Sequence, residues 1–119
     1  MNKQILVLED DQAIGILMKE VLMDMNYKVT LSQTTEAFEK NLKKTSPDLI
    51  LMDVTIDGER VDHLAKKVKK DASMQDVPLV LISGVHDLED IVQKTGADGA
   101  FSKPFDISEL ESYIQKKLA

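Results

Sequence analysis

The stretch Leu49-Ile50-Leu51-Met52-Asp53 decides the fold class of this chain. Four consecutive apolar residues are typical of a strand buried on both faces, as in a parallel sheet covered by helices. The run ends at a carboxylate, and open α/β sheets bind their ligands at the carboxyl ends of their strands. Taken alone, Asp53 fits a turn or capping residue better than a functional one, so the other strand ends must decide its role.

The composition limits the classes of protein that remain. With 119 residues, the chain is long enough for one core, so we expect residues 1–119 to form a single domain. Because the chain has no cysteine, it can form neither disulfides nor a thiolate metal site. No apolar run approaches the roughly 20 residues of a membrane span, and the N-terminus lacks a signal-peptide pattern. These features favour a cytoplasmic protein without membrane contact.

The net charge of −6 argues against nucleic-acid binding, because that binding depends on neutralising phosphates. The one basic run, at residues 66–70, lies within a helical pattern and is interpreted as a solvated helix face. We therefore expect no direct contact between this domain and nucleic acid.

Strand and helix patterns alternate along the whole chain. Apolar runs predict strands at residues 5–8, 29–31, 49–53, 78–83 and 100–102. Apolar residues at helical spacing predict helices at residues 14–25, 37–42, 61–68, 88–92 and 110–118, and residues 54–58 are expected to form a loop. This order predicts an α/β fold in which five βα units form a doubly wound five-stranded parallel sheet, with right-handed crossovers and helices on both faces.

Polar side chains follow four of the predicted strands. Glu9 and Asp10 follow the first strand, Asp53 and Ser83 end the third and fourth, and Lys103 follows the fifth. In a doubly wound sheet these ends converge on one edge. Three neighbouring carboxylates repel one another unless a cation neutralises them, and a set of oxygen ligands without His or Cys is best suited to Mg²⁺.

This arrangement also indicates phosphoryl chemistry. An aspartate such as Asp53 can act as a nucleophile toward phosphorus. Phosphoryl transfer depends on positioning and on positive charge around the phosphoryl oxygens, which a metal ion, the Lys103 ammonium and the Ser83 hydroxyl would supply. Gly84, directly after Ser83, leaves room for a tetrahedral group.

Four blocks of sequence, in order and at the usual spacing, resemble the receiver domain of bacterial response regulators. They are residues 5–11 followed by Ile14, residues 49–53, residues 80–84, and residues 96–99 leading to residues 103–105. The resemblance covers essentially the whole chain. It implies a flavodoxin-like sheet of strand order 2-1-3-4-5 that accepts a phosphoryl group from a histidine kinase or a His-containing phosphotransfer domain.

The resemblance also implies roles for individual residues. Asp53 matches the phospho-acceptor, Glu9 and Asp10 match the acidic pair that holds Mg²⁺, and the backbone carbonyl of Thr55 matches a further metal ligand. Glu9 replaces the commoner aspartate, and since one extra methylene changes reach but not ligand type, we expect Mg²⁺ binding to survive.

Two further residues match the groups that surround the phosphoryl oxygens in this family. Ser83 matches the hydroxyl that turns toward the phosphoryl group, and Lys103 matches the lysine that pairs with it. The Lys103–Pro104 peptide bond is often cis in the family.

The chain departs from the family pattern at two places. After the acceptor, Asp57 stands where a proline is usual and residues 60–61 stand where Asp-Gly is usual, so we expect a differently shaped loop. The aromatic residue that usually precedes the lysine by three positions is replaced by Ala100, and Phe101 follows one place later. Because a one-residue shift on a strand turns the side chain to the opposite face, we expect Phe101 to face the core. We also expect that phosphorylation is weakly coupled to the output of the domain, or that the coupling uses another contact.

The main interpretation is a phospho-accepting receiver domain that is not an enzyme. Its downstream effector is unknown, and a phosphorylation-dependent homodimer is one possible assembly. One alternative is a receiver-like interaction module that works without phosphorylation, which Ala100 and the altered loop favour. A minor alternative is an Asp-nucleophile phosphatase of the haloacid-dehalogenase type. That family places an aspartate two residues after its nucleophile, where this chain has Thr55.

Overall fold

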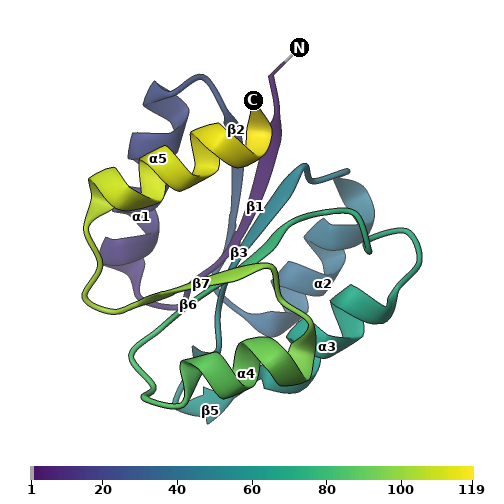
Figure 1. Cartoon of the computed structure of the whole chain (residues 1–119). Coiled ribbons are helices and arrows are strands. Elements are labelled where there is room, and N and C mark those ends of the chain that lie inside the picture. Colours follow the sequence, from purple (N-terminus) through teal and green to yellow (C-terminus); the bar gives the residue numbers. More distant parts are fainter. Residues whose placement is uncertain (1) are drawn as a thin grey trace.

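The strand that contains the acceptor candidate, β3 (Leu49–Asp53), is the central strand of a five-stranded parallel sheet (Figure 1). The structure is a computed structural model, and it describes residues 2–119. The other strands of the sheet are β1 (Gln4–Leu8), β2 (Lys28–Ser32), β6 (Leu79–Ser83) and β7 (Gly99–Ser102). Their order is β2-β1-β3-β6-β7, with all neighbours parallel, which is the predicted order 2-1-3-4-5.

Five helices cover the two faces of the sheet, as predicted. They are α1 (Gln12–Asp24), α2 (Thr35–Lys44), α3 (Asp62–Lys70), α4 (Leu88–Thr95) and α5 (Ile107–Leu118). In Figure 1, α1 and α5 lie on one side of the sheet and α2, α3 and α4 on the other. The predicted elements agree with the observed ones to within three residues at each end, so the (βα)₅ doubly wound fold is confirmed.

The buried side chains form two clusters, one on each face of the sheet. On β3, Leu49 and Leu51 belong to the cluster under α1 and α5, whereas Ile50 and Met52 belong to the cluster under α2, α3 and α4. This alternation explains why the strand is apolar at four consecutive positions, since both of its faces are covered. Asp53 is the last residue of β3 and the first polar residue of the run, so its side chain lies where the strand ends.

The segment after Asp53 differs from the predicted loop. It forms a β-hairpin in which β4 (Thr55–Ile56) pairs antiparallel with β5 (Glu59–Arg60). The two turn residues, Asp57 and Gly58, both have positive φ (53° and 78°), as type I′ turns require. Asp-Gly is among the preferred dipeptides of that turn, so the local sequence itself explains the hairpin.

Ala100 and Phe101 point to opposite faces of β7, as predicted. Ala100 packs against the cluster under α2, α3 and α4, and Phe101 packs against the cluster under α1 and α5. Phe101 is half-buried rather than fully buried, and its ring meets that of Tyr113 edge-on with centroids 5.4 Å apart. The Lys103–Pro104 bond that follows is cis. Among residues 2–119, no helix is long and apolar enough to cross a membrane.

Candidate functional site

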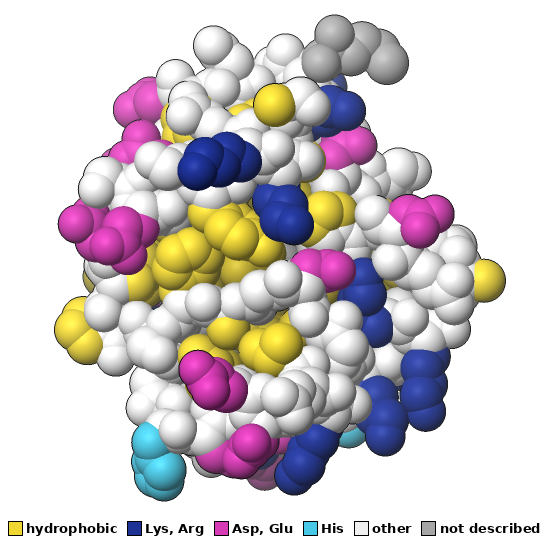
Figure 2. Space-filling view, in the orientation of Figure 1, with side chains coloured by type: hydrophobic (Ala, Val, Ile, Leu, Met, Phe, Trp, Pro, Cys, Tyr) yellow, Lys and Arg dark blue, Asp and Glu magenta, His cyan; other side chains and the backbone are white. Residues whose placement is uncertain are grey.

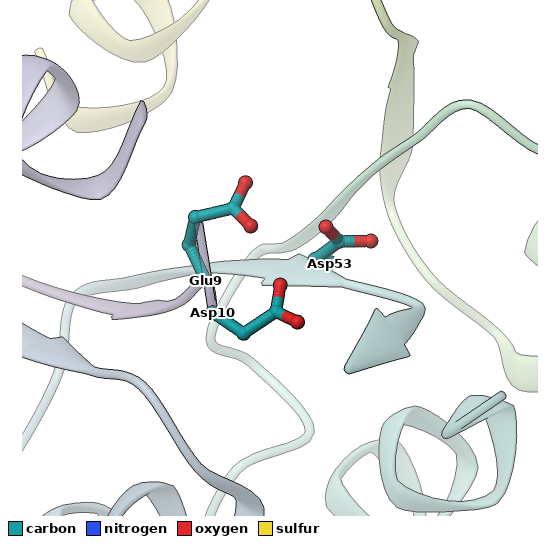
Figure 3. A group of neighbouring side chains, drawn as sticks. All are labelled: Glu9, Asp10 and Asp53. Carbon is teal, nitrogen blue, oxygen red and sulfur yellow. The ribbon is translucent and has the colours of Figure 1, made fainter. Parts of the chain in front are cut away.

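The polar groups predicted from the strand ends meet at one edge of the sheet. Figure 3 shows the carboxylates of Glu9, Asp10 and Asp53 turned toward a common space at the ends of β1 and β3. One oxygen from each of the three lies within 4.8 Å of the others. The parallel register explains this convergence, because Leu8 pairs with Met52 and the residues that follow each strand emerge side by side.

The three acids differ in their exposure to solvent. Glu9 and Asp53 are only 2% and 6% exposed, whereas Asp10 lies at the surface. Two buried carboxylates side by side need a compensating positive charge. Lys103 supplies it: its Nζ donates to Glu9 Oε1 at 2.7 Å and to Asp53 Oδ2 at 2.8 Å.

Asp53 is held at both of its carboxylate oxygens. Oδ2 accepts the hydrogen bond from Lys103, and Oδ1 accepts a 3.0 Å hydrogen bond from the Thr55 N–H, two residues further along the chain. The carboxylate is therefore fixed in orientation, with one face toward an open cavity. Such preorganisation favours reaction at a carboxylate oxygen.

Burial dominates the electrostatics of Glu9. It raises the pKa of the Glu9 carboxyl to about 7, although the hydrogen bonds from Lys103 and from the Asp11 N–H lower it. Nearby Asp53 adds a smaller upward effect on the same pKa. A divalent cation at this edge would favour the charged form, so proton and metal compete for the same carboxylate.

The charged form of Lys103 is favoured in the folded chain. Burial opposes the charged ammonium, but the hydrogen bonds to Asp53 and Glu9 outweigh that effect and raise the pKa of Lys103 above its ordinary value. Lys103 follows β7, and its N–H donates to the Ser83 carbonyl at 2.9 Å. The backbone of β6 and β7 therefore sets the position of the lysine.

A cavity of about 480 Å³ opens directly above the carboxylates. It is lined by Asp10, Asp11, Asp53, Thr55, Gly58, Ser83, Gly84, Val85 and Lys103. Ser83 is almost fully buried, and its Oγ accepts a 3.3 Å hydrogen bond from the Val85 N–H. A cavity whose wall carries an ammonium, a hydroxyl and three carboxylates can accommodate a phosphoryl group and a hard cation.

The structure thus brings together Asp53, Glu9, Asp10, Ser83 and Lys103, all of which were predicted to share a site. Thr55 lies in the cavity wall as well. Two site contacts were not predicted: the Asp11 N–H donates to Glu9 Oε2 at 3.2 Å, and the Asp57 N–H donates to Asp10 Oδ2 at 2.7 Å. Both donors are backbone groups, which a pattern of side chains does not reveal.

His63 and His86 take no part in the acidic cluster among the described residues. Asp11 caps α1, because its Oδ1 accepts a hydrogen bond from the Ile14 N–H at 3.1 Å. The third acid of the Glu9-Asp10-Asp11 run therefore has a local structural task, which leaves Glu9, Asp10 and Asp53 as the candidate metal ligands.

Comparison with known proteins identifies the class to which this fold and site belong. The family model for the response regulator receiver domain matches residues 5–115. The chain therefore belongs to the response regulator receiver domain family, the phospho-accepting domains of two-component systems. Members of this family bind Mg²⁺ at an acidic pocket, and they interact with histidine kinases or phosphotransfer proteins.

Two curated relatives differ in how much of their own length this chain matches. The phosphate regulon transcriptional regulatory protein PhoB of Escherichia coli K12 is 30% identical over 117 residues, which are 97% of this chain and 51% of that protein. Sporulation initiation phosphotransferase F of Bacillus subtilis is 29% identical over 121 residues, which are 99% of this chain and 95% of that protein. The chain spans about half the length of most of the curated relatives it matches.

Solved structures agree with the fold. The chemotaxis response regulator CheY4 of Vibrio cholerae superposes with a TM-score of 0.88 at 19% identity, covering 98% of this chain and 99% of that one. The signal receiver domain of a histidine kinase from Syntrophus aciditrophicus superposes with a TM-score of 0.85 at 25% identity, covering 98% and 89%. The first likeness shows the shared fold alone.

Proposed function

We propose that Asp53 accepts the phosphoryl group, and that Glu9, Asp10, Asp53 and the Thr55 carbonyl hold the Mg²⁺ that assists the transfer. The observation that carries this proposal is the pairing of Asp53 with Lys103 in the wall of a cavity, beside the cluster of Glu9, Asp10 and Asp53. Oxygen donors without nitrogen or sulfur fit Mg²⁺, which would neutralise negative charge on the phosphoryl oxygens when bound.

The remaining side chains have roles that follow from their positions. A carboxylate oxygen of Asp53 attacks phosphorus, a new P–O bond forms, and the bond from phosphorus to the donor breaks with its electron pair leaving on the donor. The Lys103 ammonium and the Ser83 hydroxyl line the same cavity and can donate hydrogen bonds to the phosphoryl oxygens. Ser83 can do so, since within residues 2–119 its Oγ accepts one long hydrogen bond, from the Val85 N–H, and makes no other.

The donor is proposed to be a histidine kinase or a His phosphotransfer domain that docks beside the cavity on α1. The three exposed large apolar side chains of the described residues, Ile16, Leu17 and Met23, all lie on this helix. Helix α1 begins directly after Asp11, which lines the cavity, so a partner bound there could deliver its phosphohistidine to Asp53. Residues 1–119 are proposed to form one receiver domain. A downstream effector, a location in the cytoplasm and a phosphorylation-dependent homodimer stay predictions for this protein.

The test uses a small phosphodonor, so that no partner has to be identified. The wild-type chain is incubated with Mg²⁺ and phosphoramidate, and intact mass is followed with time. We expect one added phosphoryl group on the wild type, none on Asp53→Asn, and none on the wild type in EDTA. A wild type that gains no mass would contradict the proposal and favour an interaction module that works without phosphorylation.

A further inference from the structure

The hairpin that follows the acceptor strand contacts the metal-binding edge directly. Its turn consists of Asp57 and Gly58, and the Asp57 N–H donates to Asp10 Oδ2 at 2.7 Å across 47 positions of sequence. Within residues 2–119 this is the one hydrogen bond that the Asp10 carboxylate accepts. A 2.7 Å bond from an amide to a charged oxygen is short and belongs to the stronger class of hydrogen bonds.

The base of the hairpin is fixed in the core, although its tip is exposed. Ile56 and Val61, on either side of the turn, are buried at 6% exposure, and both belong to the cluster under α2, α3 and α4. The Val61 N–H donates to the Val54 carbonyl at 2.7 Å and closes the hairpin against the end of β3. The Asp57 N–H therefore has a position that the core determines.

Asp10 lacks such support of its own. It lies at the surface after β1, whereas Glu9 beside it is buried and bound to Lys103. An exposed aspartate side chain without a partner samples several rotamers, and binding an ion would have to order it. The hydrogen bond from the turn orders it beforehand and leaves the second oxygen, Oδ1, for a ligand.

We propose that the Asp57-Gly58 turn is a positioning element that holds Asp10 in the orientation for binding Mg²⁺ and thereby sets the affinity of the site. This inference rests on the proposed function for the identity of the ion. The donor in this turn is the backbone N–H of Asp57, and both Asp57 and Gly58 have positive φ. A proline at position 57 could not donate this bond, and a β-branched residue at position 58 would strain the turn.

Gly58 offers a clean way to weaken the turn. A Cβ added there would meet no heavy atom within 4 Å, so a substitution acts mainly through the backbone conformation with φ +78°. Valine strongly disfavours positive φ, whereas asparagine tolerates it. Gly58→Val and Gly58→Asn are therefore a matched pair, and Gly58→Ala serves as a milder second variant in case Gly58→Val folds poorly.

The first experiment is a calorimetric titration of each protein with Mg²⁺ alone. We expect Gly58→Val to bind Mg²⁺ about fivefold more weakly than the wild type, Gly58→Ala to lie between them, and Gly58→Asn to stay within about twofold of the wild type. Equal affinity in the wild type, Gly58→Val and Gly58→Ala would overturn the proposal, as would tighter binding by Gly58→Val.

A second readout needs no metal. In EDTA, we expect the Asp57 amide to exchange with solvent slowly in the wild type and Gly58→Asn, and at least about tenfold faster in Gly58→Val and in Asp10→Ala, where the bond or its acceptor is lost. An Asp57 amide that exchanges equally fast in the wild type and in Asp10→Ala would show that the hydrogen bond is not formed, and would overturn the proposal.

Phosphorylation separates positioning from a general loss of structure. With phosphoramidate, Gly58→Val should be slower than the wild type at low Mg²⁺ and should reach the wild-type rate when Mg²⁺ saturates the site. A deficit that persists at saturating Mg²⁺ would overturn the proposal in favour of a structural role. If the wild type is not phosphorylated but Gly58→Val still binds Mg²⁺ more weakly than the wild type, only the proposed function is overturned. If the wild type binds no Mg²⁺, both proposals are overturned.

Discussion

Lys103 and Asp53 are 50 positions apart in sequence, yet the lysine Nζ lies 2.8 Å from Asp53 Oδ2. The same ammonium lies 2.7 Å from Glu9 Oε1. One cation therefore joins the ends of β1 and β3 to the segment that follows β7. It neutralises part of the negative charge that two buried carboxylates place at this edge of the sheet.

Replacing Lys103 by methionine should destabilise the metal-free protein more at high pH than at low pH. At pH 8 the substitution leaves the buried carboxylates of Glu9 and Asp53 without their cationic partner, and we expect a loss of about 2–4 kcal/mol in the free energy of unfolding. At pH 5 the Glu9 carboxyl can be protonated, so the loss should be smaller. Urea unfolding in EDTA at both pH values measures this, with Lys103→Arg as the charge-preserving control. Equal losses at both pH values would contradict the electrostatic role.

The raised pKa of Glu9 predicts how stability depends on pH. This pKa is about 7 in the folded chain, against a value of 4.5 for an unperturbed glutamate. Between pH 5 and pH 7 the folded state thus keeps a proton that the unfolded state has lost, so raising the pH lowers the free energy of unfolding. The contribution is about 3 kcal/mol at most.

The comparison of the wild type with Glu9→Gln isolates this contribution, because the variant cannot titrate at position 9. Thermal or urea unfolding in EDTA from pH 5 to pH 8 should show a wild-type stability that declines relative to the variant through this window. A difference that stays constant with pH would refute the raised pKa.

Competition between protons and the metal ion is a separate consequence. Because Glu9 must be ionised to serve as a ligand, the apparent affinity for Mg²⁺ should fall as the pH drops below 7, by up to about tenfold per pH unit. Titration of the wild type with Mg²⁺ at pH 8, 7 and 6 tests this, and binding should release protons to the buffer near pH 7. Identical affinities at pH 8 and pH 6 would contradict the proposed role of Glu9.

The sheet and most of the site could be predicted because their signals are local. The apolar run before Asp53 requires a strand covered on both faces, and parallel strands bring Glu9, Ser83 and Lys103 to the same edge. The capping of α1 by Asp11 is local in the same sense, since capping depends only on residues of the next turn.

The hairpin after β3 could not be predicted in the same way, because strands of two residues are too short to show alternation. The dipeptide Asp57-Gly58, directly after Ile56 and three residues before Val61, was nevertheless a usable signal for a type I′ turn. The bond from Asp57 to Asp10 depends on the path of the backbone between distant segments, and no local pattern encodes it.

Lys69 is expected to be a structural residue despite its place in a basic helical run. Its ammonium donates to the carbonyls of Gln75 and Val77 and to Asp98 Oδ2, at 2.9, 3.1 and 2.9 Å, and its side chain is 11% exposed. Lys69→Met should lower the free energy of unfolding by about 1.5–3 kcal/mol, because three acceptors lose a charged donor whose side chain is largely buried.

Lys67, in the same helix, provides the matched control. Its side chain is 74% exposed and lies 3.6 Å from Glu39, a surface ion pair of the kind that contributes little. Lys67→Met should change the free energy of unfolding by about 0.5 kcal/mol or less. Equal effects of Lys69→Met and Lys67→Met in urea unfolding would show that the Lys69 contacts are not important for stability.

The last prediction concerns the route from Asp53 to the surface. Ala100 carries no ring that could change its rotamer, and Phe101 is packed on the other face of β7 against Tyr113. Phosphorylation should therefore perturb backbone NMR signals at the ends of β3 and β6 and in the loop to α4, while the signals of Phe101 and Tyr113 change little. Within that loop, Asp87 lies 3.5 Å from the Arg60 guanidinium of the hairpin, so a response could pass between them.

Spectra of the protein with and without phosphoramidate, in Mg²⁺, distinguish the two routes, and Asp53→Asn serves as the unphosphorylated control. Arg60→Gln should reduce the response at the start of α4 by weakening its contact with the hairpin, without changing the mass gained at Asp53. Large shifts of the ring signals of both Phe101 and Tyr113 on phosphorylation would show instead that β7 and α5 relay the signal, because the two rings pack edge-on and a change in that packing moves both signals.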